Sequence, residues 1–207
     1  MARWEPDARG RLETAAMELF QERGYVETTV EDIAARAGLT ERTFFRHFAD
    51  KREVLFSGSK ELVKGIVDRI ERTPPEVGPL ETVAAAFEAA GAELQELRDL
   101  RFVRARYALV IKHTEIQERE LIKLASLAVA VTKALHARGV SEPAASLAAE
   151  AGVAVFKVGF ERWVSEKKPQ DFAAHIRAAV DALKAVAAEG GGKAQAPRAK
   201  KSATRRA

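Results

Sequence analysis

Residues 28–56 read TTVEDIAARAGLTERTFFRHFADKREVLF. Their hydrophobic spacing predicts three short helical segments, separated by one tight turn and one short loop. Gly38 marks the turn, because glycine accepts the positive φ angle that a tight interhelical turn requires. Thr29 and Thr40 stand where the N-caps of the helices before and after this turn are expected. The stretch therefore predicts a helix-turn-helix, in which two short helices meet at a steep angle.

Three phenylalanines fall close together in this stretch. Phe44 and Phe48 are four residues apart and share one helical face, so we expect them to be buried against Leu19 and Ile33. Phe45 points elsewhere, either to the core or to a groove of DNA. Residues 36–52 carry a local charge of +3, which comes from five basic and two acidic residues: Arg36, Arg42, Arg46, Lys51, Arg52, Glu41 and Asp50.

The rest of the chain shows helical periodicity and no convincing alternation of the strand type. A first helix is expected over 7–24. A fourth is expected to begin at Asp50 and run to Ile70, and the Thr-Pro-Pro sequence at 73–75 ends it. Five alanine-rich helices are expected after Pro79, carrying Leu80–Leu97, Leu100–Ile111, Ile116–Leu135, Leu147–Val158 and Phe172–Leu183.

These elements predict an all-α protein in three parts. Residues 1–52 are expected to form a three-helix domain that contains the helix-turn-helix, and residues 53–189 a larger helical bundle. Residues 190–207 are expected to be a disordered basic tail. The tail holds six basic residues and no acidic one, so of the net charge of +4 the rest of the chain carries −2. Any contact of the body with nucleic acid must therefore come from a local cluster of cations.

Several classes of protein are disfavoured by composition. The chain has no cysteine, which excludes disulfides and thiolate-bound zinc. The four histidines are scattered, with no second ligand at metal spacing. No catalytic set and no glycine-rich phosphate loop are found, so neither an enzyme nor a cofactor or metal site is expected. Neither a signal peptide nor an apolar run of membrane-spanning length is found, and we expect a cytoplasmic protein.

The helix-turn-helix region resembles the TetR family of transcriptional regulators. The resemblance rests on the order and spacing of these residues: Ala16, Leu19, Phe20, Gly24, Tyr25, Thr28-Thr29-Val30, Asp32-Ile33-Ala34, Ala37-Gly38, Arg42-Thr43-Phe44-Phe45-Arg46-His47-Phe48 and Lys51. It implies that the first domain binds DNA and that the helical bundle binds a ligand and dimerises.

The resemblance also implies roles for single residues. The positions that reach base edges are Glu41, Arg42 and Phe45, and Arg46 also lies on a face that is free to enter the major groove. The positions that contact phosphate are Thr29, Thr43, His47 and Lys51. Arginine can bind guanine O6 and N7, and glutamate can accept from cytosine N4. Many family members have tyrosine where Phe45 stands. Because Phe45 lacks the tyrosine hydroxyl, it can only contact a thymine methyl group or pack against other apolar groups.

Three of these roles have alternatives in ordinary structure. Arg42 can be a solvated cation near phosphate, and His47 can be a local cap partner. Arg46 can pair with Asp50, four residues further along the chain.

The larger bundle carries an aromatic stripe at Phe156, Phe160 and Trp163. Such a stripe is either ordinary core or one wall of a ligand cavity. As a cavity, it would be lined by Phe87, Arg104, Tyr107, His113, Phe156, Phe160 and Trp163, although Arg104 is also readable as a surface or structural cation. A weaker similarity, to the TetR subgroup with acyl-CoA-like ligand domains, suggests an acyl thioester as effector.

Four small residues suit a helix-on-helix dimer interface: Ala148, Ala151, Gly152 and Gly159.

The sequence thus predicts a homodimeric regulator that binds a palindromic double-stranded DNA operator. A repressor released by a small apolar or amphipathic effector is favoured over an activator. A helical small-molecule-binding protein or enzyme with vestigial DNA binding is the alternative from another class.

Overall fold

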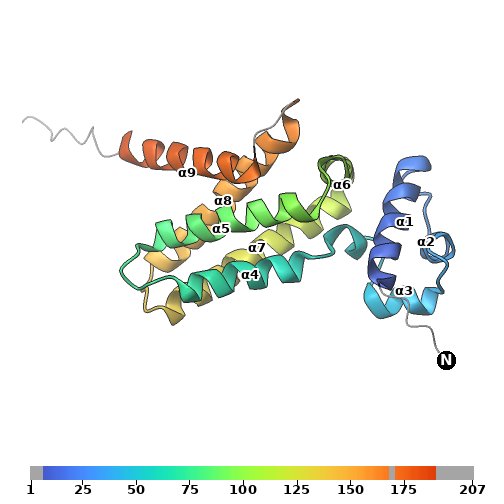
Figure 1. Cartoon of the computed structure of the whole chain (residues 1–207), viewed down its shortest axis with the longest axis horizontal. Helices are drawn as coiled ribbons and strands as arrows, with labels where there is room; N and C mark the ends of the chain where they lie inside the picture. The colour runs from blue at the N-terminus through green and yellow to red at the C-terminus, as the bar shows by residue number, and fades with distance from the viewer. Residues whose placement is uncertain (1–6, 168–170, 190–207) are drawn as a thin grey trace, which may run out of the picture.

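A computed structural model describes residues 7–167 and 171–189 of the 207-residue chain. Within these ranges the secondary structure is helical and contains no strand, which confirms the all-α prediction. Figure 1 shows α1–α3 gathered at one end of an elongated molecule and the longer helices at the other. No helix in the described ranges is long and apolar enough to cross a membrane. The predicted disorder of 190–207 lies outside the described residues.

The N-terminal helices are α1 (Ala8–Glu22), α2 (Val30–Arg36) and α3 (Glu41–His47). The predicted caps are present. The Thr29 hydroxyl accepts from the backbone N–H of Asp32, whose carboxylate in turn accepts from the backbone N–H of Thr29. The Thr40 hydroxyl accepts from the backbone N–H of Thr43. Gly38 has a φ angle of 65° in the turn, so the helix-turn-helix forms where local sequence chemistry predicts it.

Two of the three clustered phenylalanines close the N-terminal core. Phe44 and Phe48 are buried in the cluster that also contains Leu19 and Ile33, as predicted. Phe45 is 55% exposed, so the structure turns it away from the core.

The predicted fourth helix is two elements. A 3₁₀ turn, η1 (Glu53–Phe56), is followed by α4 (Ser59–Arg72). The carboxylate of Asp50 accepts from the backbone N–H groups of Arg52 and Glu53, so it caps the short turn only. Gly58 adopts a φ angle of 83°, which interrupts the helical path and lets α4 start in a new direction.

The remaining helices build the bundle: α5 (Pro79–Leu97), α6 (Leu100–Lys112), α7 (Thr114–Ala137), α8 (Ala144–Ser165) and α9 (Phe172–Glu189). They enclose a core together with α4. In Figure 1, α6 is seen nearly end-on between this bundle and α1. The α6–α7 corner therefore lies where the two groups of helices meet.

Glycines on α8 serve packing within the chain. A Cβ atom on Gly152 would lie 2.3 Å from Cγ1 of Val83 on α5, and one on Gly159 would lie 3.1 Å from the backbone N of Ile176 on α9. Ala148 is also buried. The prediction that these small residues form a dimer face is therefore wrong, because three of the four lie inside the protomer and allow close approach of its own helices.

The N-terminal core does not end at the helix-turn-helix. It includes Leu55 and Phe56 of η1, and also Val110 of α6 and Ile116 of α7, all of them buried. The side chains that complete this core thus come from a corner far along the sequence. The boundary expected between residues 52 and 53 falls within this cluster of contacts and stays a prediction.

Candidate nucleic-acid interface

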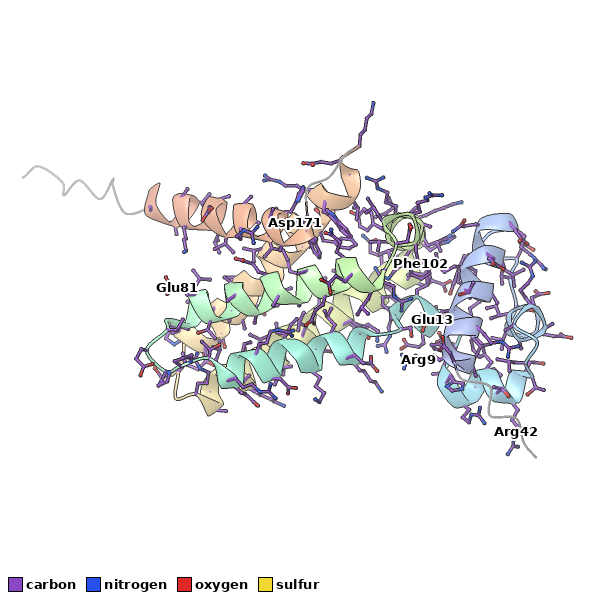
Figure 2. The ribbon with its side chains drawn as sticks, viewed as in Figure 1. Arg9, Glu13, Arg42, Glu81, Phe102 and Asp171 are labelled. Atoms are coloured by element: carbon purple, nitrogen blue, oxygen red, sulfur yellow. The ribbon has the colours of Figure 1, made fainter. Side chains whose placement is uncertain are left out.

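The outward face of α3 carries four exposed side chains, those of Glu41, Arg42, Phe45 and Arg46. The helix is only two turns long, but Phe44 on its opposite face is fully buried and fixes its rotation. Figure 2 shows Arg42 at the outer end of the N-terminal helices, pointing away from the bundle. The four predicted base-reading residues therefore share one solvent-facing surface.

The two arginines of this surface carry uncompensated charge. Within the described ranges, the Arg42 side chain has no hydrogen-bond or ion-pair partner. Arg46 approaches only Nε2 of its neighbour His47, at 3.5 Å. Together with Thr43 they line an open hollow of about 330 Å³. The alternative pairing of Arg46 with Asp50 is wrong, because Asp50 binds Arg52 instead, at 2.6 Å.

Two other cations of the local cluster, Arg36 and Arg52, are paired with acidic residues of the protein. Arg36 binds the Glu22 carboxylate through two N–H groups, at 2.9 and 2.7 Å, and lies 3.3 Å from Glu18. The hydrogen bond from Arg36 holds the pKa of Glu22 below its ordinary value. The positive charge that can act on an external anion is therefore concentrated on α3.

The family model described as "Bacterial regulatory proteins, tetR family" matches residues 13–57, the region that contains this surface. The helix-turn-helix region of the chain is that of the TetR family. Among curated relatives, the transcriptional regulator TcmR of Streptomyces glaucescens is 40% identical over 81 residues, which are 39% of this chain and 36% of TcmR. The transcriptional repressor KstR2 of Mycobacterium tuberculosis is 34% identical over 87 residues, 40% of this chain and 42% of KstR2. The matches thus span less than half of the length of these relatives.

Solved structures extend the likeness to most of the chain. SmeT, the repressor of a Stenotrophomonas maltophilia multidrug efflux pump, is 25% identical with a TM-score of 0.56, covering 86% of this chain and 89% of SmeT. FadR of Thermus thermophilus, solved in complex with lauroyl-CoA, is 22% identical with a TM-score of 0.53, covering 92% and 98%. The order of an N-terminal helix-turn-helix and a C-terminal helical bundle is therefore the TetR fold.

Two of the residues predicted to contact phosphate have hydroxyls that already form hydrogen bonds. The Thr29 hydroxyl lies 2.7 Å from the Asp32 carboxylate as part of the cap of α2. The backbone N–H of Thr29 also binds this carboxylate and helps to lower its pKa. The Thr43 hydroxyl lies 3.1 Å from that of Thr40. Both residues stay proposed phosphate contacts, together with the half-exposed His47.

Lys51 has a different role from the predicted one. Its ammonium group donates to the backbone carbonyls of Tyr25, Val26 and Thr28, at 2.8, 3.2 and 2.9 Å, and lies 4.5 Å from the centre of the Tyr25 ring. An ammonium group has three N–H donors, and all three are occupied. Lys51 is therefore a clamp on the loop before α2, and the structure does not support the phosphate contact predicted for it.

Glu13 forms a contact that could not be predicted from sequence patterns. This α1 carboxylate is only 6% exposed and accepts from Nη2 of Arg98 at 2.8 Å and from the Ser57 hydroxyl. Arg98 follows α5 directly, and its guanidinium lies 5.1 Å from the centre of the Phe102 ring on α6. Glu13 and Phe102 line an open groove of about 780 Å³ between α1 and the α5–α6 corner, close to where Figure 2 labels them.

Further contacts join η1 and the loop before α2 to the bundle. The carboxylate of Glu53 binds Arg119 and lies 3.4 Å from the ammonium group of Lys123, both on α7. The hydrogen bond from Arg119 holds the pKa of Glu53 below its ordinary value. The ring of His113 lies 5.1 Å from that of Tyr25. The N-terminal helices are thus tied to α6 and α7 at several points.

The predicted effector residues are only partly brought together. Phe87, Phe156, Phe160 and Trp163 belong to one cluster of contacting rings, which Tyr107 joins through Phe160 at 5.6 Å. The stripe is therefore packed core. Sequence reasoning missed Phe172 on α9, which stacks on Trp163 at 4.8 Å.

Two of the predicted pocket residues lie elsewhere. Arg104 donates to the backbone carbonyls of Val164 and Glu166 at the end of α8, so it is a structural cation. His113 follows α6 and packs against Tyr25 of the N-terminal helices, and it makes no ring contact with the aromatic cluster. Neither residue provides a polar end to a site among the rings, and this part of the prediction is wrong.

The outer faces of α8 and α9 carry apolar side chains among exposed charged ones such as Glu150, Lys157 and Asp181. Leu147 and Val158 on α8 and Val186 on α9 are exposed, with the exposed alanines Ala154, Ala178 and Ala182 on the same helices. These positions, and not the glycines, give the two helices a surface that a second copy can cover.

Proposed function

We propose that this chain is a transcriptional regulator of the TetR family that binds double-stranded DNA through α3 and acts as a repressor. One observation carries the proposal. Arg42 and Arg46 are four residues apart on the exposed face of α3, whose N-terminus is capped and whose other face packs on the core. Neither arginine has an ion-pair partner among the described residues. A buried core on one side and free guanidinium groups on the other suit a helix that enters the major groove.

Within this proposal, base edges are read by Glu41, Arg42, Phe45 and Arg46. Phosphates are contacted by Thr29, Thr43 and His47. Guanidinium groups can bind guanine bidentately, and exposed acidic side chains can accept from cytosine. The neutralised cations Arg36 and Arg52 stabilise the fold and are not part of the interface.

Dimerisation is proposed to use the outer faces of α8 and α9. A two-fold contact buries the same patch of both protomers, and here Leu147, Val158 and Val186 are the large side chains that gain from burial. The two copies of α3 then read half-sites about 34–36 Å apart, or a multiple of it, on a pseudo-palindromic operator.

A small apolar or amphipathic effector is proposed to release the DNA. The aromatic cluster of Phe87, Tyr107, Phe156, Phe160 and Trp163 is the proposed site, and an effector there has to part rings that are now in contact. A ligand that binds better to a state with a rearranged α6–α7 corner raises the population of that state. In it, the two copies of α3 no longer match the spacing of the half-sites. An acyl thioester should then release the operator more strongly as its chain lengthens, and release that is independent of length would contradict this effector class.

The function is tested by selecting binding sites from random duplexes with the full-length protein. The expected result is a pseudo-palindrome, with Arg42→Ala costing about 1–3 kcal/mol and relaxing the preference at one position per half-site. Arg101→Ala, on the exposed side of α6, is the matched control and should leave the affinity unchanged. Failure to enrich any sequence would overturn the proposal in favour of a helical small-molecule-binding protein. A cytoplasmic location, expected from the sequence, would follow from DNA binding.

A further inference from the structure

One face of α7 is open to solvent and yet carries large apolar side chains. Ile122 and Val129 lie on this face and are 55% and 54% exposed. Ala125 and Ser126 lie between them and are exposed as well. The opposite face of the helix packs in the core, where Val131 is fully buried. The exposed residues 122, 125, 126 and 129, called here the α7 stripe, run over about two helical turns, and no part of the described chain covers them.

A charged residue stands at each end of the α7 stripe. Glu118 lies one turn before Ile122, and Lys133 lies one turn after Val129. Both side chains are exposed, and within residues 7–167 and 171–189 neither has an ion-pair or hydrogen-bond partner. The helix dipole acts mainly on the first and last turns, and both residues lie further inside α7. The two charges are therefore available to a partner outside the protomer.

The order of these residues is complementary to its own reverse. When two copies of α7 lie antiparallel about a two-fold axis between residues 125 and 126, Glu118 of each copy faces Lys133 of the other. Ile122 then faces Val129, and the small residues 125 and 126 meet at the axis, where they allow the helices to approach closely. In a two-fold contact each pair occurs twice. The contact therefore has an apolar centre with an ion pair at each end.

A second copy of this chain fits the α7 stripe better than a membrane does. An anionic lipid surface attracts basic residues at the rim of an apolar helix face, and it would repel Glu118. An acidic end and a basic end at equal distances from the centre are what an antiparallel pair of identical helices requires. Charge complementarity thus selects the partner.

We propose that α7 pairs antiparallel with α7 of a second copy through this stripe, separately from the α8–α9 faces proposed for dimerisation. The stripe holds two large apolar side chains per copy, so the contact is smaller than stable protein interfaces, which bury about 1,200–2,000 Å². Free copies therefore pair weakly. Two dimers held at neighbouring operators on one DNA have a raised effective concentration, and the α7 contact then makes their binding cooperative. That consequence rests on the proposed function, whereas the pairing itself does not.

The test is sedimentation equilibrium of the full-length protein over a wide range of concentrations. Glu118→Lys and Lys133→Glu should each weaken the association through α7 about ten-fold, because like charges then face each other at both ends. Mixed in equal amounts, the two variants should associate with each other as strongly as the wild type does, since each supplies the charge that the other lacks. Lys60→Glu, on the exposed side of α4, is the matched control and should change nothing.

Two further variants separate this contact from the α8–α9 dimer. Ile122→Glu should lower the mass reached at high concentration, because it places a charge in the apolar centre. If it does so while Leu147→Glu on α8 has no effect, the proposed dimer contact is wrong and the α7 pairing stands. The reverse result overturns the α7 pairing and leaves the proposed function intact, as does a mixture that associates no better than its separate components. Every substituted side chain is exposed, so none of these changes threatens the fold.

Discussion

The carboxylate of Glu13 and the guanidinium of Arg98 lie 2.8 Å apart, where α1 meets the corner between α5 and α6. The Glu13 side chain is almost wholly buried, and the Ser57 hydroxyl donates to the same carboxylate. The Glu13 carboxylate thus accepts hydrogen bonds both from Ser57, directly after η1, and from Arg98 of the helical bundle. Because a buried charge without a partner is costly, this contact fixes how the N-terminal helices sit on the bundle.

Arg98→Met should destabilise the protein by about 1–3 kcal/mol, because Glu13 stays buried and loses its shorter ion pair, which leaves Arg9 at 3.6 Å as its cation. Glu13→Gln combined with Arg98→Met should recover most of this loss. Urea unfolding measures both. The control is Lys64→Met, which breaks the exposed Lys64–Asp68 pair on α4 and should change stability by less than about 0.5 kcal/mol. Equal losses of stability from Arg98→Met and from Lys64→Met would contradict a special role for Glu13.

Lys51→Met should lower stability by about 1–3 kcal/mol, because three backbone carbonyls lose the donor that holds the loop before α2. The slope of operator affinity against salt concentration should be unchanged. Arg46→Met provides the contrast: it should leave stability unchanged and weaken binding to the selected operator by about 1–3 kcal/mol, because Arg46 is a proposed base-reading residue. A reduced salt slope for Lys51→Met would restore Lys51 as a phosphate contact.

Gly38→Ala should cost about 1–2 kcal/mol, since the φ angle of 65° is unfavourable for a residue with a Cβ atom. The new Cβ would also lie 2.9 Å from Nη2 of Arg11. Gly78→Ala, where φ is −60° and no atom lies within 4 Å of the new Cβ, is the control and should cost less, because it loses only the preference of an N-cap for glycine over alanine. Thermal unfolding of the two variants decides whether the turn between α2 and α3 depends on glycine.

The ion pair of Glu53 with Arg119 should make stability depend on pH. The folded pKa of Glu53 is lowered by the hydrogen bond from Arg119, so the contribution is fully present above the unfolded pKa, about 4.3 for a glutamate. It is lost as the pH falls through the lower, folded pKa. The stability difference between the wild type and Arg119→Met should therefore shrink between pH 7 and pH 3.5. A difference that is constant over this range would show that Arg119 acts through packing alone.

The helix-turn-helix could be predicted because its determinants are local. The caps Thr29 and Thr40, the turn at Gly38 and the burial of Phe44 and Phe48 each depend on residues a few positions apart. The break between η1 and α4 has a local signal as well, because Gly58 is a glycine. The helical spacing of apolar residues continues on both sides of Gly58, however, so it predicts one continuous helix.

The contacts across the junction could not be predicted, because their partners are distant in sequence or are backbone atoms. Glu13 and Arg98 are 85 residues apart. Lys51 binds carbonyl groups, which every residue carries and no sequence pattern marks. Gly152 and Gly159 were assigned to the wrong neighbour for a related reason. A small residue indicates close approach of another helix but does not say whether that helix belongs to the same chain.

The burial of Val110 and Ile116 in the N-terminal core has a consequence for synthesis of the protein on the ribosome. When Phe56 has been added to the growing chain, the helices before it still lack the side chains that cover them. Ile116 follows roughly three to twelve seconds later, at about 5–20 residues per second. Throughout that interval the nascent chain presents apolar surface to chaperones and to neighbouring chains. The region made first is thus completed only after more than half of the polypeptide has been translated.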